Sequence, residues 1–174
     1  MHTVRYPDVP GVVPVHEQLR PGCVINIHGK VDERGYKNFA VEFLSGPNVV
    51  LHINFRFHCN ENEVVMNSCN DGNWGQEIPS YNPLHRGDRF NIQICVQHDN
   101  YEIQVNGQHL AYYSHRFPME SVQAIGIKGD VFIDRIEFTG FEFRTDWNQD
   151  YHYGHSGYYG YGTVCYLPPV EIDD

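Results

Sequence analysis

Hydrophobic and polar residues alternate with a period of two along most of the chain. In Leu51–Phe57 the first residue and every second one after it are large and apolar, and the residues between them are polar. Because successive side chains of a strand point to opposite faces, this pattern predicts a strand with one face in a core. The same alternation predicts further strands at Cys23–His28, Phe39–Phe43, Phe90–Gln97, Tyr101–Val105, Leu110–Tyr113, Val122–Ile127 and Val131–Phe138.

Turn residues separate these segments, and helix signals are nearly absent. Asn106-Gly107 stands between two alternating runs and is the strongest short signal for a β-hairpin. Many short strands at regular spacing predict an all-β antiparallel sandwich. After about Gly140 the alternation stops, and a Tyr- and Gly-rich stretch predicts a tail that is either mobile or draped over the domain. We therefore divide the chain into an N-terminal segment 1–12, a domain 13–143 and a C-terminal tail 144–174.

Composition and charge narrow the class of protein. The chain has 174 residues, is 41% hydrophobic and carries a formal net charge of -10, which fits one globular domain plus an extra segment. Because an acidic chain repels phosphate groups and anionic lipids, nucleic-acid and membrane-surface partners are not expected. No run of apolar residues reaches the length of a bilayer span, so membrane insertion is not expected either.

The cysteines and the N-terminus bear on location. The five cysteines are an odd number and include no C-x-x-C pair, which favours free thiols in a reducing compartment. The first residues contain prolines and no continuous apolar run, so we expect no signal peptide. Location in the cytoplasm is therefore the expectation, with non-classical export to the extracellular space as the alternative.

Signals for catalysis and for metal binding are weak. The chain has no G-x-S-x-G, P-loop or H-E-x-x-H motif, and no predicted strand repeats acidic residues at period two, as a glycosidase of this architecture often does. His152 and His155 form the only close histidine pair, and they lie in the tail. We expect no catalytic residue, no metal site and no cofactor.

The polar face of the strand Leu51–Phe57 carries hydrogen-bond donors where Lys, Glu and Thr are usual. Together with Val64–Glu77 it supplies an imidazole, two amides, a guanidinium, an indole and a carboxylate: His52, Asn54, Asn67, Arg56, Trp74 and Glu77. Sugar hydroxyls need donors and acceptors in fixed directions, and a flat indole covers the C–H face of a pyranose. Galactose suits such a site, because its axial 4-hydroxyl leaves one face of C–H groups unobstructed for the ring. These residue types therefore predict a carbohydrate site.

These residues also resemble the fingerprint of a known family. H-x-N-x-R, V-x-N and W-x-x-E, here His52, Asn54, Arg56, Val65, Asn67, Trp74 and Glu77, are similar to the motif of the galectins, the β-galactoside-binding lectins. The resemblance covers roughly residues 13–140 and includes Leu19–Gly29, which looks like the family's entry strand. It implies a two-sheet jelly-roll sandwich of the concanavalin-like lectin type, with the sugar on the concave sheet. The implied function is recognition of β-galactosides on glycoproteins or glycolipids.

The resemblance also implies a role for each residue. His52, Asn54 and Arg56 would bond the axial 4-hydroxyl and the ring oxygen, and Trp74 would stack beneath the ring. Asn67 and Glu77 would bond the 6-hydroxyl, while Arg56 and Glu77 would also touch a second sugar. The family usually has Arg two residues after the Glu, where this chain has proline, and the loop before Asn67 matches no single family pattern. The candidates for a second-sugar subsite are Asn60, Glu61 and Pro79.

Two alternatives stay open beside a lectin. One is a galectin-fold interaction module with weak or altered glycan specificity, and the other is a glycosidase on a similar sandwich. Taken singly, Trp74 reads as a packing residue and Arg56 with Glu77 as a surface ion pair of little energy. The ordered spacing of seven positions favours binding over these readings. The tail is either a solvated extension or a self-association segment, in which case the protein is a homo-oligomer.

Overall fold

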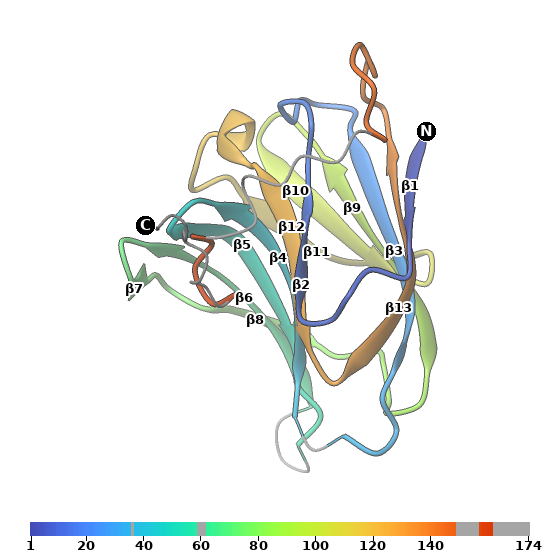
Figure 1. Ribbon diagram of the computed structural model, residues 1–174. Helices are drawn as coiled ribbons and strands as arrows, with labels where there is room; N and C mark the ends of the chain where they lie inside the picture. Colours follow the sequence, from blue (N-terminus) through green and yellow to red (C-terminus); the bar gives the residue numbers. More distant parts are fainter. Residues whose placement is uncertain (36, 59–61, 149–156, 162–174) are drawn as a thin grey trace, which may run out of the picture.

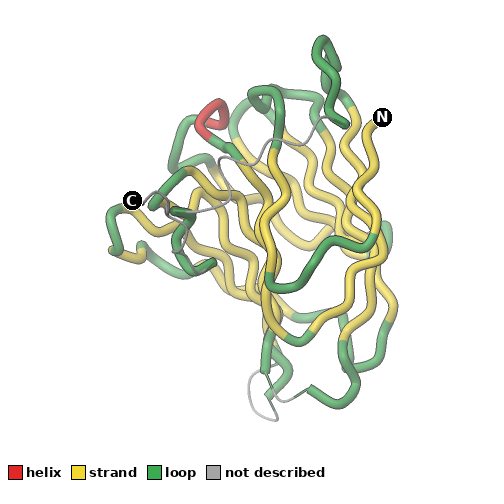
Figure 2. Tube along the Cα trace, in the orientation of Figure 1, coloured by secondary structure: helices red, strands yellow, loops and turns green. Residues whose placement is uncertain are grey.

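The chain forms two antiparallel sheets packed face to face (Figures 1 and 2). A computed structural model describes residues 1–35, 37–58, 62–148 and 157–161. One sheet has the order β1 (His2–Arg5), β13 (Val131–Thr139), β3 (Val24–Val31), β9 (Arg89–Val96), β10 (Asn100–Val105) and β11 (Gln108–Ser114). The other has the order β2 (Gly11–Pro14), β12 (Ala124–Gly129), β4 (Phe39–Ser45), β5 (Asn48–Phe55), β6 (Glu63–Asn70) and β7 (Asn73–Trp74), and β8 (Ile78–Tyr81) pairs with β6. A short 3-10 helix, η1 (Met119–Ser121), precedes β12.

The predicted β-sandwich is confirmed, and its core is the apolar half of the alternating pattern. Leu51, Ile53 and Phe55 on β5 have no exposed surface. The Phe39 ring on β4 stacks on Phe55 at 4.7 Å and on Phe90 of β9 at 5.5 Å, so it joins the two sheets. Full burial of such a side chain stabilises the fold by about 1.5–3 kcal/mol. The opposite face of β5 is left for polar side chains.

The hairpin predicted at Asn106-Gly107 joins β10 to β11. Asn106 has φ of 52° and Gly107 has φ of 80°, so both lie in the left-handed region that a two-residue hairpin turn requires. Val105 pairs with Gln108 on either side of the turn.

The segment 1–12, which was separated from the domain on sequence grounds, is part of the sandwich. β1 pairs with β13 in the register Val4 to Ile136, and β2 begins at Gly11 and pairs with β12. The boundary at residue 13 therefore does not mark an edge of the folded unit. β1 was not predicted because its four residues, HTVR, show no alternation of apolar and polar positions.

The described parts of the tail 144–174 are draped over the domain. Trp147 is 5% exposed, lies 5.4 Å from the Phe138 ring and 4.9 Å from the Phe141 ring, and donates a hydrogen bond from Nε1 to Glu17. Residues 157–161 lie against the sheet of β4 and β12 (Figure 1). The boundary at residue 144 therefore cuts through a packed cluster. His152 and His155 lie outside the described residues.

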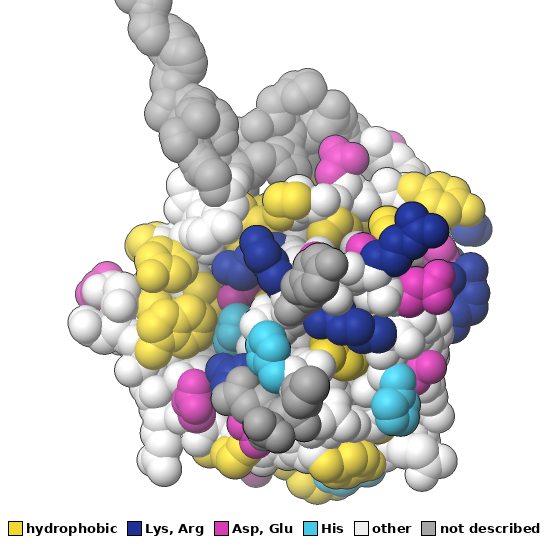
Figure 3. Space-filling view, turned by 90° about the horizontal axis from the view of Figure 1, so that it is seen from below, with side chains coloured by type: hydrophobic (Ala, Val, Ile, Leu, Met, Phe, Trp, Pro, Cys, Tyr) yellow, Lys and Arg dark blue, Asp and Glu magenta, His cyan; other side chains and the backbone are white. Residues whose placement is uncertain are grey.

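The surface at the end of the sandwich shown in Figure 3 carries mixed charge. Basic, acidic and histidine side chains are interspersed there, and no single sign dominates the view. Among the residues that the structure describes, no helix has the length and apolar character needed to cross a membrane.

The packing of Trp147 gives a prediction about stability. Trp147→Ala is expected to lower the free energy of unfolding by about 3–5 kcal/mol, because removal of a buried aromatic side chain leaves a cavity. Chemical denaturation of the full chain measures this. The matched control is Tyr112→Ala, since Tyr112 is 59% exposed and its replacement is expected to cost about 1 kcal/mol or less. Equal costs for the two variants would contradict the burial of Trp147.

Candidate functional site

The predicted site residues come together on the outer face of the second sheet. His52 and Asn54 project from β5 on the side away from the core, and Asn67 projects from the same side of β6, where its Cα pairs with that of His52. Trp74 forms the end of β7, and Glu77 lies just before β8. We call the outer surface of β4, β5, β6 and β7 the polar face. Antiparallel pairing thus collects residues from three strands without any long loop.

A carboxylate that was not predicted as a site residue supports His52. Glu42 on β4 pairs with His52 in the ladder and has no exposed surface. His52 Nδ1 lies 2.5 Å from Glu42 Oε2. Because a carboxylate only accepts hydrogen bonds, Nδ1 carries a proton, and Nε2 is the ring nitrogen that remains to meet a ligand. Glu42 therefore orients the imidazole and fixes its protonated nitrogen.

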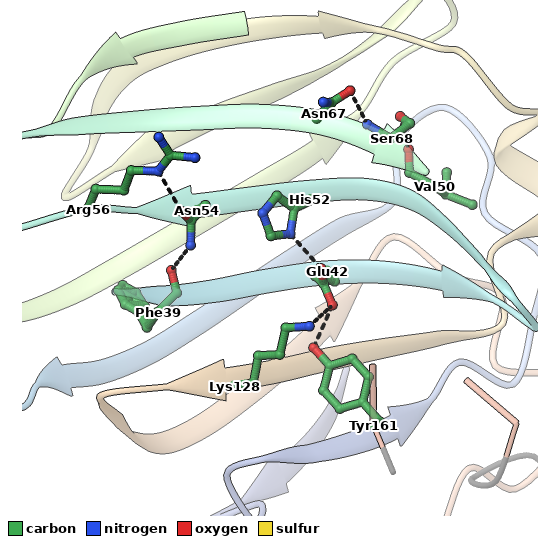
Figure 4. Close-up of polar contacts among 10 residues, drawn as sticks. All are labelled: Phe39, Glu42, Val50, His52, Asn54, Arg56, Asn67, Ser68, Lys128 and Tyr161. Atoms are coloured by element: carbon green, nitrogen blue, oxygen red, sulfur yellow. Dashed lines mark hydrogen bonds and ion pairs between the residues drawn. The ribbon is translucent and has the colours of Figure 1, made fainter. Parts of the chain in front are cut away.

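Two further groups compensate the charge of Glu42 (Figure 4). The Tyr161 hydroxyl donates to Oε1 at 2.8 Å, and Lys128 Nζ lies 3.6 Å from the same oxygen. Burial alone pushes the pKa of Glu42 upward. The hydrogen bond and charge of His52, together with Lys128 and Tyr161, outweigh burial and bring the pKa of Glu42 below its ordinary value. The carboxylate is therefore ionised at neutral pH.

Arg56, directly after β5, joins two other predicted residues. Its Nε donates to Asn54 Oδ1 at 2.8 Å, and its Nη2 lies 3.6 Å from Glu77 Oε2. Asn54 is 6% exposed and donates from Nδ2 to the Phe39 carbonyl at 3.2 Å. Figure 4 shows Arg56, Asn54 and His52 in a row along the strand. The row presents a guanidinium, an amide and an imidazole in fixed orientations.

Asn67 holds the segment that carries Trp74. Its Nδ2 donates to the Gly75 carbonyl at 2.8 Å, and its Oδ1 accepts from Arg116 Nη1 at 2.8 Å. Arg116 follows β11 of the other sheet, and its Nη2 donates to the Gln76 carbonyl at 2.7 Å. The side chains of Asn67 and Arg116 therefore fix the main chain just after the indole. Arg116 was not predicted as a site residue. It lies far from the motif in the sequence, and no local pattern links it to Asn67.

Trp74 adds an exposed aromatic ring to the otherwise polar residues of the candidate site. The indole is 43% exposed, and its centroid lies 4.9 Å from the His52 ring at an interplanar angle of 62°. An exposed flat ring beside an imidazole, in the same sheet as a guanidinium–carboxylate pair, suits a ligand that has one apolar face and several hydroxyl groups.

The three candidates for a second-sugar subsite are placed only in part. Pro79 lies exposed in β8, where it pairs with Val65 of β6. Asn60 and Glu61 lie outside the described residues. Within the described ranges, no group of three His, Cys, Asp or Glu side chains is arranged to hold a metal ion.

The cysteines with described surroundings are free thiols: Cys23, Cys69 and Cys95. Burial raises the pKa of each of these three thiols, which favours the protonated form. Cys59 and Cys165 lie outside the described residues.

Comparison with known proteins finds relatives over nearly the whole chain. Residues 10–138 match a family model described as galactoside-binding lectin. A Caenorhabditis elegans protein named probable galaptin lec-8 is 52% identical over 170 residues, which cover 98% of this chain and 94% of the relative. A second C. elegans protein, probable galaptin lec-7, is 41% identical over 149 residues, which cover 86% of this chain and 83% of the relative.

Solved structures show the same arrangement of sheets. The crystal structure of C. elegans galectin LEC-6 superposes with a TM-score of 0.73 at 26% sequence identity and covers 79% of this chain and 95% of that chain. A variant of human galectin-16 superposes with a TM-score of 0.70 at 28% identity and covers 79% of this chain and 100% of that chain. The likeness therefore extends from the sequence to the sandwich itself.

The charge compensation of Glu42 gives a prediction about pH. Because the pKa of Glu42 is lowered in the folded protein, the ionised group stabilises the fold above its ordinary pKa of 4.5. This stabilisation is lost as the pH falls through the folded-state pKa. Glu42→Gln is therefore expected to cost about 1–3 kcal/mol of unfolding free energy at pH 7 and less near pH 3.

Chemical denaturation of both proteins at the two pH values tests this. Glu33→Gln, which removes an exposed carboxylate, is the control for loss of a surface charge. A cost of Glu42→Gln that is the same at both pH values would contradict the compensated charge.

Proposed function

The chain belongs to the galectin family of galactoside-binding lectins, and on this premise we propose that its polar face binds β-galactosides on glycoproteins or glycolipids. The observation that carries the proposal is the convergence of the motif residues on one face. His52 lies beside the exposed Trp74 indole, Arg56 bonds Asn54 and pairs with Glu77, and three strands or their ends supply these residues. The protein acts by recognition and not by catalysis.

The geometry supports the roles that the family resemblance implies. Trp74 covers the C–H face of galactose, while His52 Nε2 and the Arg56 guanidinium face its axial 4-hydroxyl and ring oxygen. The resemblance assigns the second sugar to Arg56 and Glu77, and the separation of 3.6 Å between Nη2 and Oε2 supports their acting together in this role. Each donor is already held by a protein partner, so little conformational entropy is lost when a sugar binds.

Asn67 acts in two ways in this proposal. One of its amide hydrogens holds the Gly75 carbonyl, and the second is the group that would meet the galactose 6-hydroxyl. At 4% exposed, Asn67 offers little contact surface. Its larger contribution is to keep Trp74 and Glu77 in place through the chain between them.

The surroundings of Glu42 argue against a glycosidase. A retaining or inverting glycosidase needs two carboxyl groups at the scissile bond. Glu42 lies beside the polar face, but it is fully buried and engaged with His52, Lys128 and Tyr161. It therefore positions His52 and does not reach a ligand. The other alternative is an interaction module with weak or altered glycan specificity. Measurement of sugar binding distinguishes it from a β-galactoside lectin.

Self-association through the tail stays a separate proposal. The Tyr- and Gly-rich composition of residues 144–174 favours it, whereas the described residues 157–161 are engaged with their own sheet. Any surface for a second copy in the tail would therefore come from other residues of that segment.

The first binding prediction concerns Trp74. An open site with one stacked ring is expected to bind lactose with a Kd of about 0.1–1 mM. Trp74→Ala is expected to cost about 1–3 kcal/mol of binding free energy, because it removes the stacking surface. Isothermal titration calorimetry measures both values. Tyr112→Ala on the opposite sheet is the control, and unchanged lactose binding by Trp74→Ala would show that the site is wrongly placed.

The second binding prediction concerns Pro79. Proline has no N–H and no charge, so the donor that the family resemblance leads one to expect at this position is missing. Pro79→Arg is expected to tighten lactose binding by about 1 kcal/mol, the value of a charged hydrogen bond. Free galactose is expected to gain less, because the new group would lie beside the second sugar. An equal gain for galactose and lactose in calorimetry would show that Pro79 acts on the strand instead.

A further inference from the structure

Residues Gly157–Tyr161, which we call the tail strap, cover part of the outer face of the second sheet. Tyr158 is 8% exposed and closes a small apolar cluster that lies outside the main core. The other members of this cluster are Leu44, Val49, Cys69 and Ala124. The Tyr159 N–H donates to the Gly46 carbonyl at 3.3 Å. An apolar patch on the sheet is thus covered by the chain itself, and this cover includes Leu44 on the outer face of β4.

Tyr161 attaches the tail strap to both β4 and β12. Its hydroxyl donates to Glu42, and Lys128 Nζ lies 5.0 Å from the centroid of its ring. The ring lies directly on β12 because Gly126 has no side chain: a Cβ there would come within 2.5 Å of Tyr161 Cζ. Burial, together with the neighbouring Glu42 carboxylate, raises the pKa of the Tyr161 hydroxyl, so it stays a donor at physiological pH.

The tail strap borders the sugar site on one side only. Glu42 holds His52 through Oε2 and Tyr161 through Oε1, so a single carboxylate separates the two side chains. The Tyr159 ring lies 6.5 Å from Trp74 in an edge-to-face arrangement. Figure 4 shows Tyr161 beyond Glu42, while Arg56 lies at the opposite end of the row of donors. The strap and the proposed exit toward a second sugar are therefore on different sides of the site.

This arrangement limits which galactosides fit, and the argument rests on the proposed function. With the ring oxygen and the second sugar on the side of Arg56 and Glu77, the opposite side of the pyranose faces Glu42 and the tail strap. In a pyranose, C3 lies across the ring from the ring oxygen. The 3-hydroxyl of the bound galactose therefore points toward the strap, and a further sugar on it would meet Tyr159 and Tyr161.

We propose that the tail strap is a wall of the carbohydrate site and makes the protein selective for terminal galactose with a free 3-hydroxyl. The trisaccharide can make every contact that lactose makes, so only a steric clash can exclude it. The tail strap supplies this clash. Tyr159 and Tyr161 are then specificity-determining residues, although they lie far from the motif in the sequence.

Calorimetry of the full chain with two neutral sugars tests the wall. The probes are lactose and the trisaccharide that carries an α-linked galactose on the 3-hydroxyl of the lactose galactose. The natural protein is expected to bind lactose at least about tenfold more tightly than the trisaccharide. Two variants displace the strap by different routes: Gly126→Ala fills the space under the Tyr161 ring, and Tyr158→Ser with Tyr161→Ser removes the attached side chains.

Each displaced variant is expected to lower the ratio of lactose affinity to trisaccharide affinity, measured within that variant, to about threefold or less. The ratio is the readout because a change at Glu42 and His52 weakens both sugars alike, whereas loss of the wall favours the trisaccharide alone. Tyr112→Ser, on the opposite sheet, is the matched control and is expected to keep the natural preference. Circular dichroism and the unfolding midpoint identify any variant that fails to fold. Because the two routes are independent, one folded variant is enough for the comparison.

The possible outcomes distinguish failure of the wall proposal from failure of the proposed lectin function. Lactose binding with equal affinity for the trisaccharide in the natural protein would overturn the wall and leave the proposed function intact. A tenfold preference that persists in the displaced, folded variants would also overturn it, since another part of the site would then reject the trisaccharide. Absence of lactose binding in the folded natural protein and in both variants would overturn the proposed function, and the wall with it.

Discussion

The site depends on one buried charge. Glu42 lies in the middle of β4 with no exposed surface, so its ionised carboxylate is stable only where other groups compensate it. Its partners come from three separate parts of the chain: His52 from β5, Lys128 from β12 and Tyr161 from the tail. Loss of one partner would leave the charge poorly compensated. The orientation of a ligand-facing imidazole and the attachment of the tail are thus parts of the same electrostatic arrangement.

The two rows of β5 link stability to recognition. Leu51, Ile53 and Phe55 fill the core, while His52 and Asn54 stand on the outer face of the same strand. Because side chains alternate strictly, a shift of the ladder by one residue would exchange the two rows. The core therefore fixes the register of β5, and the register fixes which donors face outward. The motif needs no flexible loop for its first two residues.

The fold class, most of the strands and the binding motif could be predicted from the sequence, because each is a local pattern. Alternation located β5 and β9, and the order of polar types located His52 and Trp74. The structure adds partners that are distant in sequence, such as Glu42 with Tyr161 and Asn67 with Arg116. A lone acidic residue in an apolar strand marks Glu42 as unusual, but nothing in the local pattern names the residues that compensate it. Such pairs depend on how the sheets and the tail pack.

The support beneath Trp74 has a consequence for how this protein can change over evolutionary time. Asn67 donates a hydrogen bond to the Gly75 carbonyl, and Arg116 donates one to the Gln76 carbonyl. Every residue has a backbone carbonyl, so neither bond requires a particular side chain at position 75 or 76. At position 75, however, a Cβ would come within 2.9 Å of Arg116 Nη1, so a larger residue there would displace the guanidinium. Gln76 is exposed, and its side chain takes no part in these bonds. A substitution at position 76 would therefore keep the hydrogen bond to its carbonyl, so the side chain next to Gly75 can change while the support beneath the indole is retained.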